Sequence, residues 1–275
     1  MVVRNVRPLA EAMEALGNQF HLPITYEDPP YLFPGDIEDI TSRVMRPEAV
    51  AHLLATGQRL PVLMGMKERE LKFGYAFPAN SQSSDSQVRA AIQSALDAYN
   101  SGYPPGIFEL RHAGGRFHVF PKMVKDKSGK YIPWTSLLDL PISVEVKERR
   151  ADEFLQVLCF AVSRAGQNPF HFGNGVVSNG LIQQRTSLGG QNRPARELLL
   201  AFLTELESRD SDRSYKNSWA VLNDGSSRAF ALNLYGVPTG ATGEGNRGAG
   251  SAPSPVEKTD ISKLHIPNSE ELQSD

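Results

Sequence analysis

The chain has 275 residues, of which 40% are hydrophobic and 22% charged, with a formal net charge of −2 and one cysteine. This length allows one large or two small domains, and the lack of a basic excess argues against nucleic acid or an anionic membrane surface as a partner. No apolar run approaches the ~18 residues of a membrane-spanning helix, and the single Cys159 excludes an intramolecular disulfide, so we expect it in the core.

The first predicted elements are a strand over "VVRNV", a helix over residues 8–17 and a strand over "PITYED". The helix has one apolar stripe at the spacing i, i+3, i+4, i+7, formed by Leu9, Ala12, Met13 and Leu16. Pro8 suits the first turn of this helix, and Gly17 suits its end. The strand should stop at Pro29-Pro30, because proline cannot donate to a ladder.

Residues 29–77 are predicted to be an insertion in this first unit. "RPEAVAHLLATG" indicates a short helix, and "LPVLMG" with "ELKFGYAF" indicates a pair of strands. A helix over residues 84–99 follows, with serine and aspartate as cap candidates. The next stretch, "GIFELRHAGGRFHVFP", alternates around Gly114-Gly115 and predicts a hairpin. Residues 123–139 then read as a connecting strand, a turn at Lys127-Ser128-Gly129 and a return strand.

The same order of elements recurs in the second half of the chain. A helix is predicted over residues 150–165, where Ala151 and Leu158 lie 142 positions after Leu9 and Leu16. "FHF" follows as a strand in which Phe170 and Phe172 share a face.

The second helix of each half also repeats, at a different offset. In the helix over residues 193–206, Ala195 and Leu203 lie 107 positions after Val88 and Leu96. A hairpin around Asp224-Gly225 completes the second half. We therefore predict an α+β fold of two tandem related modules, small sheets packed on helices, over residues 1–122 and 140–237. The Gly-, Ser- and Pro-rich residues 238–275 are predicted to be a disordered tail.

A family resemblance accompanies this pattern. "VRNVRPLAEAMEALGNQFHLPITYED" resembles the opening of STN, the short domain at the N-termini of secretins and TonB-dependent transducers. The residues that match the family pattern are Pro8, Leu9, Ala10, Glu11, Ala12, Leu16, Ile24, Tyr26 and Asp28. "SLGGQNRPARELLLAFL" resembles the second half of that domain, and the whole chain resembles duplicated, mostly secreted proteins of the acidobacterial type. The resemblance implies two-helix modules flanked by small sheets, which serve as protein-interaction modules of the Gram-negative envelope.

The cellular location depends on where translation starts. "MVVRNVRPL" lacks the apolar segment of 7–15 residues that a signal peptide contains. We expect a periplasmic or secreted protein if a leader is missing from this chain, and a cytoplasmic protein if Met1 is the true start.

"YEDPPY" is the most distinctive polar stretch, and three interpretations apply to it. Adjacent strand residues point to opposite faces, so Glu27 and Asp28 are poorly placed to act as an acid/base pair. One interpretation is a charged strand end before a rigid turn, and another is catalysis. The third is a rigid, exposed partner surface with aromatic anchors, made of Tyr26, Glu27, Asp28, Pro29, Pro30 and Tyr31.

Other polar residues predict no cofactor or metal site. The six histidines show no metal-ligand spacing, although His112 and His118 flank the Gly114-Gly115 turn and could approach each other. Residues 243–248 match G-x-G-x-x-G, but the following "AGSAPSP" cannot form the helix that a dinucleotide site needs. Arginines recur near helix starts, and we expect them to pair with Glu11 or Glu153 or to reflect repeat ancestry alone.

These observations give three hypotheses for the function. The first is a non-enzymatic protein-interaction or assembly module of the cell envelope, with another envelope protein as partner and an open oligomeric state. The second is a protein that binds a small ligand or glycan in the cleft between the modules. The third is an enzyme, for which Glu27, Asp28 and His171 are the candidate residues.

Overall fold

The computed structural model describes residues 1–76, 84–173, 183–209, 215–225 and 228–239, which form a mixed α+β fold. The first module consists of β1 (Val2–Asn5), α1 (Pro8–Phe20), β2 (Ile24–Glu27), β5 (Arg69–Lys72), α4 (Asp85–Ser101), β6 (Gly106–Ala113) and β7 (Arg116–Lys125). Strands β1 and β5 pair antiparallel, and β2, β7 and β6 form a second group of strands. Helices α1 and α4 pack between the two groups, because their apolar stripes contact both.

The second module repeats this layout. It consists of β9 (Pro141–Val144), β10 (Arg149–Arg150), α5 (Ala151–Gly166), β11 (Phe170–Phe172), β12 (Arg185–Thr186), β13 (Gly190–Pro194), α7 (Ala195–Arg209), β14 (Tyr215–Asn223) and β15 (Phe230–Pro238). Strand β9 pairs with β13, β10 pairs with β12, and β11, β15 and β14 form the larger group. Helices α5 and α7 share a core with these strands, in which Phe154 stacks on Phe202.

The two modules have the same strand order, as the sequence repeat predicts. In the first, β2 runs parallel to β7, which pairs antiparallel with β6. In the second, β11 runs parallel to β15, which pairs antiparallel with β14. The registers place Ile24 opposite Phe117 in one module and Phe170 opposite Phe230 in the other. The duplication is thus confirmed at the level of topology.

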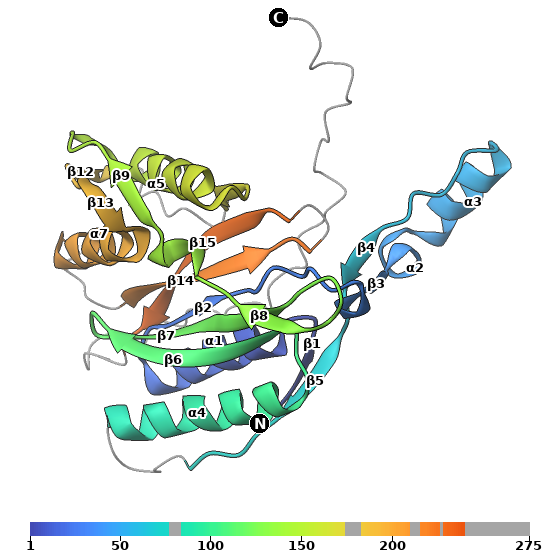
Figure 1. Cartoon of the computed structure of the whole chain (residues 1–275), viewed down its shortest axis with the longest axis horizontal. Helices are drawn as coiled ribbons and strands as arrows, with labels where there is room; N and C mark the ends of the chain where they lie inside the picture. The colour runs from blue at the N-terminus through green and yellow to red at the C-terminus, as the bar shows by residue number, and fades with distance from the viewer. Residues whose placement is uncertain (77–83, 174–182, 210–214, 226–227, 240–275) are drawn as a thin grey trace, which may run out of the picture. The chain divides into compact units, whose positions relative to one another are not determined.

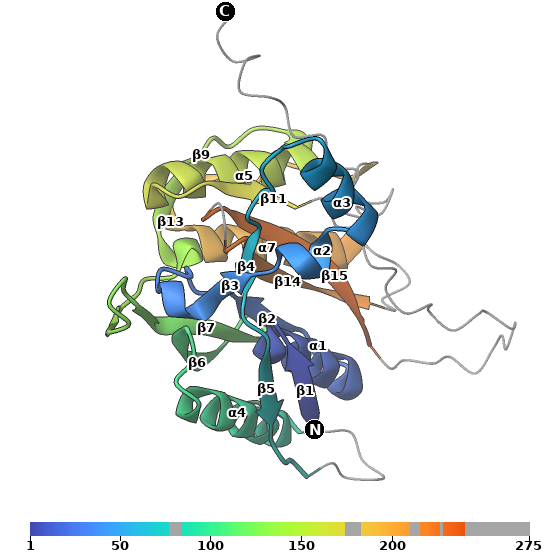
Figure 2. The ribbon, with the colours of Figure 1, turned by 90° about the vertical axis from the view of Figure 1, so that its right-hand side faces the viewer.

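The modules join edge to edge into one sheet of order β11-β15-β14-β2-β7-β6. Strand β14 runs parallel to β2, with Ala220 opposite Tyr26 and Val221 opposite Glu27. This pairing makes β2 antiparallel to its equivalent β11, so one module is turned over relative to the other. Helices α1 and α4 consequently cover one face of the sheet, and α5 and α7 cover the other (Figures 1 and 2).

The insertion forms a separate feature. It contains η1 (Pro34–Asp36), β3 (Ile37–Asp39), α2 (Thr41–Val44), α3 (Pro47–Ala55) and β4 (Met64–Met66). The helix predicted from "RPEAVAHLLATG" is confirmed as α3, but the predicted pairing of "LPVLMG" with "ELKFGYAF" is wrong. Strand β4 pairs with β3, whereas β5 pairs with β1, because Leu71 and Phe73 are buried in the core of the first module.

The remaining predictions concern the end of the first helix, the connecting hairpin and the tail. Helix α1 continues past Gly17 to Phe20, and its C-cap is His21, whose φ of 56° is left-handed. Gly17 does not end the helix, because it is buried against the Leu22 carbonyl and serves close packing. The predicted connecting hairpin is confirmed: β8 (Tyr131–Pro133) pairs with β7 around a turn at residues 126–129, before η2 (Leu137–Asp139). The predicted tail lies outside the described residues from residue 240 onward.

Candidate functional site

The stretch "YEDPPY" lies in the interior, so the prediction that it forms an exposed partner surface is wrong. Tyr26, Glu27 and Asp28 are 2%, 4% and 2% exposed, and Pro29, Pro30 and Tyr31 are also buried. The prolines do end the strand as predicted. However, β2 is a central strand with β14 on one side and β7 on the other. The second module therefore covers side chains that were predicted to be exposed.

Asp28 is the centre of a hydrogen-bonded network on the α1 face of the sheet. Its carboxylate accepts hydrogen bonds from Nε of Arg7 at 2.6 Å and from the backbone N–H of Asn223 at 2.9 Å. The hydroxyls of Tyr26 and Tyr31 donate to the other oxygen at 2.9 and 3.3 Å. Burial, and then the Asp28 charge, raises the pKa of both tyrosines well above the ordinary value, so both remain donors. All four partners satisfy the buried charge.

Glu27 has the corresponding position on the opposite face. Its carboxylate forms an ion pair of 2.7 Å with Arg196, in the first turn of α7, and accepts a hydrogen bond from Ser136. Arg196 also contacts Asp139 at 2.6 Å and lies over the Phe120 ring at 5.2 Å from its centroid. The neighbouring acids therefore point to opposite faces, as predicted. The expected arginine partners, Glu11 and Glu153, are wrong for Arg7 and Arg196, because the strand brings buried carboxylates closer.

A third buried charge cluster surrounds Lys125 at the base of the insertion. The Lys125 ammonium donates to the Tyr103 carbonyl at 2.9 Å and to Asp36 at 3.3 Å. It lies 3.7 Å from the centroid of the Tyr103 ring. Arg69 pairs with the same Asp36 oxygen at 2.6 Å. Desolvation lowers the pKa of Lys125, and the cluster ties η1 to β5 and β7.

The histidines do not form a catalytic or metal centre with the acids. His171 is exposed on β11, which β15 and β14 separate from Glu27 and Asp28 on β2. His118 is buried, bonds Thr25 at 2.8 Å and stacks on Trp219, whereas His112 stacks on Phe117. No three His, Cys, Asp or Glu side chains of the described residues converge so as to hold a metal ion.

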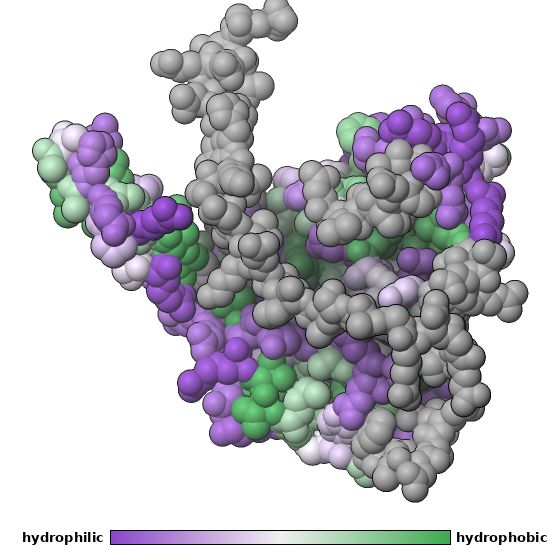
Figure 3. Space-filling model, turned by 180° about the vertical axis from the view of Figure 1, so that it is seen from behind, coloured by the Kyte–Doolittle hydropathy of each residue, from purple (hydrophilic) through white to green (hydrophobic). Residues whose placement is uncertain are grey.

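An exposed apolar segment is one feature that the sequence interpretation missed. We define the arm as residues 40–64, which contains α2 and α3 and stands apart from the sheet (Figure 1). Every residue of the two helices is partly or fully exposed. Large apolar side chains are exposed here among hydrophilic ones (Figure 3), namely Val44, Leu54, Val62 and Met64. The signal in the sequence was the apolar content of an insertion that the repeat does not contain.

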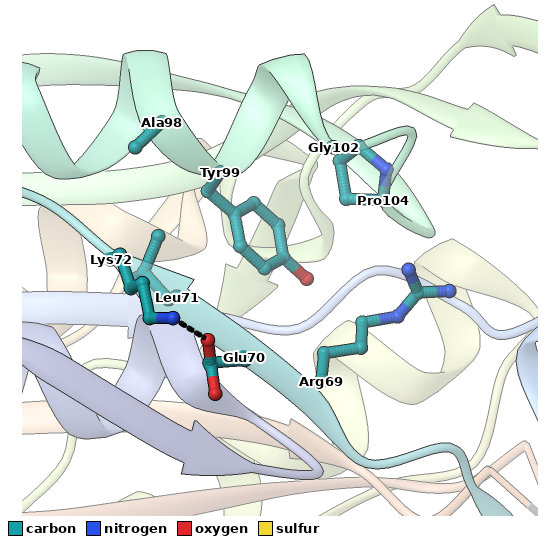
Figure 4. A pocket seen from close by; sticks show the side chains of 8 residues that line it. All are labelled: Arg69, Glu70, Leu71, Lys72, Ala98, Tyr99, Gly102 and Pro104. Carbon is teal, nitrogen blue, oxygen red and sulfur yellow. Dashed lines mark ion pairs between the residues drawn. The ribbon is translucent and has the colours of Figure 1, made fainter.

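A small pocket of about 70 Å³ lies in the first module, between β5 and the end of α4 (Figure 4). Its wall includes Arg69, Tyr99 and the Lys72–Glu70 ion pair of 2.5 Å. Both of its walls belong to the first module, so it is not a cleft between modules. No signal in the sequence indicated this pocket, because residues 69–72 and 98–104 meet only through the packing of β5 on α4.

A search of the described residues for membrane-spanning helices and three comparisons with known proteins gave no match. No helix within the described ranges is long and apolar enough to cross a membrane. Comparison with protein-family models, curated proteins and solved structures gave no match to the chain.

Proposed function

We propose that the chain is a non-enzymatic protein-interaction or assembly module of the bacterial cell envelope, formed by two STN-like modules. The observation that carries the proposal is the exposed arm. The assignment to the envelope comes from the sequence resemblance and is supported by the layout of each module, in which two helices lie between small groups of strands.

The arm has the properties of a surface that a partner covers. Helix α3 has nine residues, and isolated helices shorter than ~12–15 residues are marginal in water. Packing normally stabilises such a helix, yet its Leu54 is 61% exposed, and Val62, in the segment that follows the helix, is 68% exposed. A partner that covers these side chains would gain apolar burial from them and would stabilise the helix at the same time.

The buried acids give less support to an enzyme or to a ligand cleft. Glu27 and Asp28 each form an ion pair with an arginine, and neither lines the pocket between β5 and α4. The pocket described above is far smaller than the roughly 300–1,000 Å³ typical of ligand sites.

Site-specific photo-crosslinking in cells tests the proposal. A photoreactive amino acid at Leu54 in the full chain should give a discrete crosslinked protein that fractionates with the envelope. The matched control is the same amino acid at Phe160, an apolar side chain on α5 that is 64% exposed but lies outside the arm. Leu54→Glu with Val62→Glu should remove the partner captured from a third arm position, Val44. Equal crosslinking from Phe160, or no arm-specific product, would argue against the arm as the interaction surface.

A further inference from the structure

The pocket between β5 and α4 brings a hydroxyl and a guanidinium to face each other. Tyr99 comes from the last turns of α4 and Arg69 from the start of β5, and Figure 4 shows the Tyr99 hydroxyl directed toward Arg69. The Lys72–Glu70 pair lies on another wall, where Arg4 also approaches Glu70 at 3.6 Å. Arg4 also pairs with Glu68 at 3.5 Å, so two cations and two carboxylates balance each other on that wall.

The Tyr99 side chain is mostly buried, yet no side chain or backbone group of the described residues pairs with its hydroxyl. The residue is 8% exposed, and its ring packs edge-to-face on Phe108 with centroids 5.5 Å apart. The hydroxyl hydrogen-bonds to no described residue. The hydroxyl oxygen itself is open to solvent at the pocket and is not one of the fully buried unpaired atoms. The group is thus free to bond to a molecule inside the pocket.

The charges behind the pocket are unequal. Arg69 and Lys125 both contact one carboxylate, Asp36, at 2.6 and 3.3 Å. Two cations therefore share one anion in a buried cluster. Of the Arg69 guanidinium, only Nη2 bonds to a described residue, which leaves other N–H groups as donors toward the pocket. A hydroxyl and a partly unpaired guanidinium, placed side by side, can both donate hydrogen bonds to an oxyanion.

We propose that this pocket binds a small oxyanion through the Tyr99 hydroxyl and the Arg69 guanidinium. The volume of about 70 Å³ suits a group of a few heavy atoms, such as a carboxylate or phosphate, and excludes a nucleotide or a sugar ring. The anion is either a free small molecule or a carboxylate at the end of a peptide. The inference rests on the pocket alone and does not depend on the arm.

Calorimetric titration of the full chain tests the site. Acetate, inorganic phosphate and triglycine with a free C-terminus are the probes, at constant ionic strength with chloride as the balancing salt. At least one should bind saturably. Tyr99→Phe should weaken that binding about tenfold or more, since a hydrogen bond to a charged group is lost. The melting temperature of the variant without anion should equal that of the parent, because the hydroxyl makes no bond in the free protein.

Two controls make the outcome decisive. Tyr103→Phe removes the hydroxyl of a more exposed tyrosine that donates to the Gly129 carbonyl outside the pocket, and it should leave anion binding unchanged. Binding of free triglycine but not of its amide or of acetate would identify a peptide carboxylate as the source, whereas binding of acetate or phosphate would identify a free anion. Lack of saturable binding by all three probes would overturn the proposal, as would equal affinity in Tyr99→Phe.

Discussion

Glu27 and Asp28 show how two neighbouring residues can fix a strand from both of its faces. Each carboxylate meets an arginine at the start of a helix, Arg7 before α1 and Arg196 in α7. The net stabilisation from a buried ion pair is small because both charges lose water, but removal of one partner leaves an unpaired buried charge. We infer that the pairs specify which helix packs on which face of β2.

Replacement of Asp28 by asparagine should therefore destabilise the protein strongly. The variant keeps the shape of the side chain but removes the charge that Arg7 and the two tyrosines share, so the free energy of unfolding should fall by about 3–5 kcal/mol. Urea unfolding followed by circular dichroism measures this. The matched control, Glu70→Gln, removes a carboxylate from a solvated ion pair and should leave the midpoint nearly unchanged. Similar midpoints for the two variants would refute the assigned role of Asp28.

His118 predicts a dependence of stability on pH. Burial, and then the nearby Arg196 charge, lowers the pKa of His118 from 6.5 to about 3 in the fold. The unfolded chain takes up a proton below pH 6.5 while the folded chain does not, so stability should fall as the pH drops from about 7 toward 3.

In the variant His118→Gln, stability should decrease less steeply as the pH falls. Between pH 7 and pH 5 its free energy of unfolding should decrease by about 2 kcal/mol less than that of the parent, at ~1.4 kcal/mol per pH unit below the unfolded pKa. Urea midpoints at the two pH values measure the difference. His112→Gln, which also removes one histidine from the same hairpin, is the control for the general effect. Equal slopes in His118→Gln and the parent would contradict a neutral buried imidazole.

At the scale of elements, the arm and the sheet differ in how they are held. The helices α1, α4, α5 and α7 each bury an apolar stripe, whereas every residue of α2 and α3 remains at least partly exposed. The arm joins the first module through β3 and β4, which pair with each other, and through the charge cluster around Asp36. Its contribution to stability should therefore be small.

Replacement of residues 41–63 by a short glycine-serine linker tests this. The melting temperature should change by no more than a few degrees, because β3, β4 and the Asp36 cluster remain and the deleted helices are exposed. A thermal melt followed by circular dichroism gives the answer. A loss of ten degrees or more would mean that the arm contributes to the core and is not a separate surface.

At the scale of the whole molecule, one sheet connects the two modules. The pairing of β14 with β2, the Glu27–Arg196 ion pair and the Asn223–Asp28 hydrogen bond all cross between them. A module that unfolded alone would leave these buried charges and a sheet edge without partners. We therefore expect residues 1–240 to unfold as one cooperative unit.

Core substitutions in each module test that cooperativity. Leu16→Ala and Leu155→Ala remove fully buried side chains from the first and second cores, and each should cost about 2–5 kcal/mol. In both variants, tryptophan fluorescence and far-ultraviolet circular dichroism should report one coincident urea transition at a lower midpoint. Val157→Ala, on the exposed face of α5, is the control and should have little effect. Two separate transitions in either variant would show that the modules fold independently.

The local pattern of the sequence determined the helices, the hairpins and the duplication. Apolar spacing of 3.6 residues located the core helices α1, α4, α5 and α7, and paired glycines with φ of 56° and 68° formed the Gly114-Gly115 turn. The constant offsets between the halves predicted their equal strand order, because both copies bury the same stripes against the same strands. These features depend on residues close together in the chain.

Only the tertiary structure decided where β2 lies and what its polar residues do. Its neighbour β14 is almost 200 positions away in the sequence, and nothing in "ITYE" shows that a strand from the other module will pair with it. That pairing converts a predicted exposed surface into the buried junction of the protein. Likewise, the Tyr99–Arg69 pocket exists only because β5 packs on α4, so spacing along the chain could not reveal it. Long-range strand pairing sets burial, and burial decides whether a polar residue serves the core or a partner.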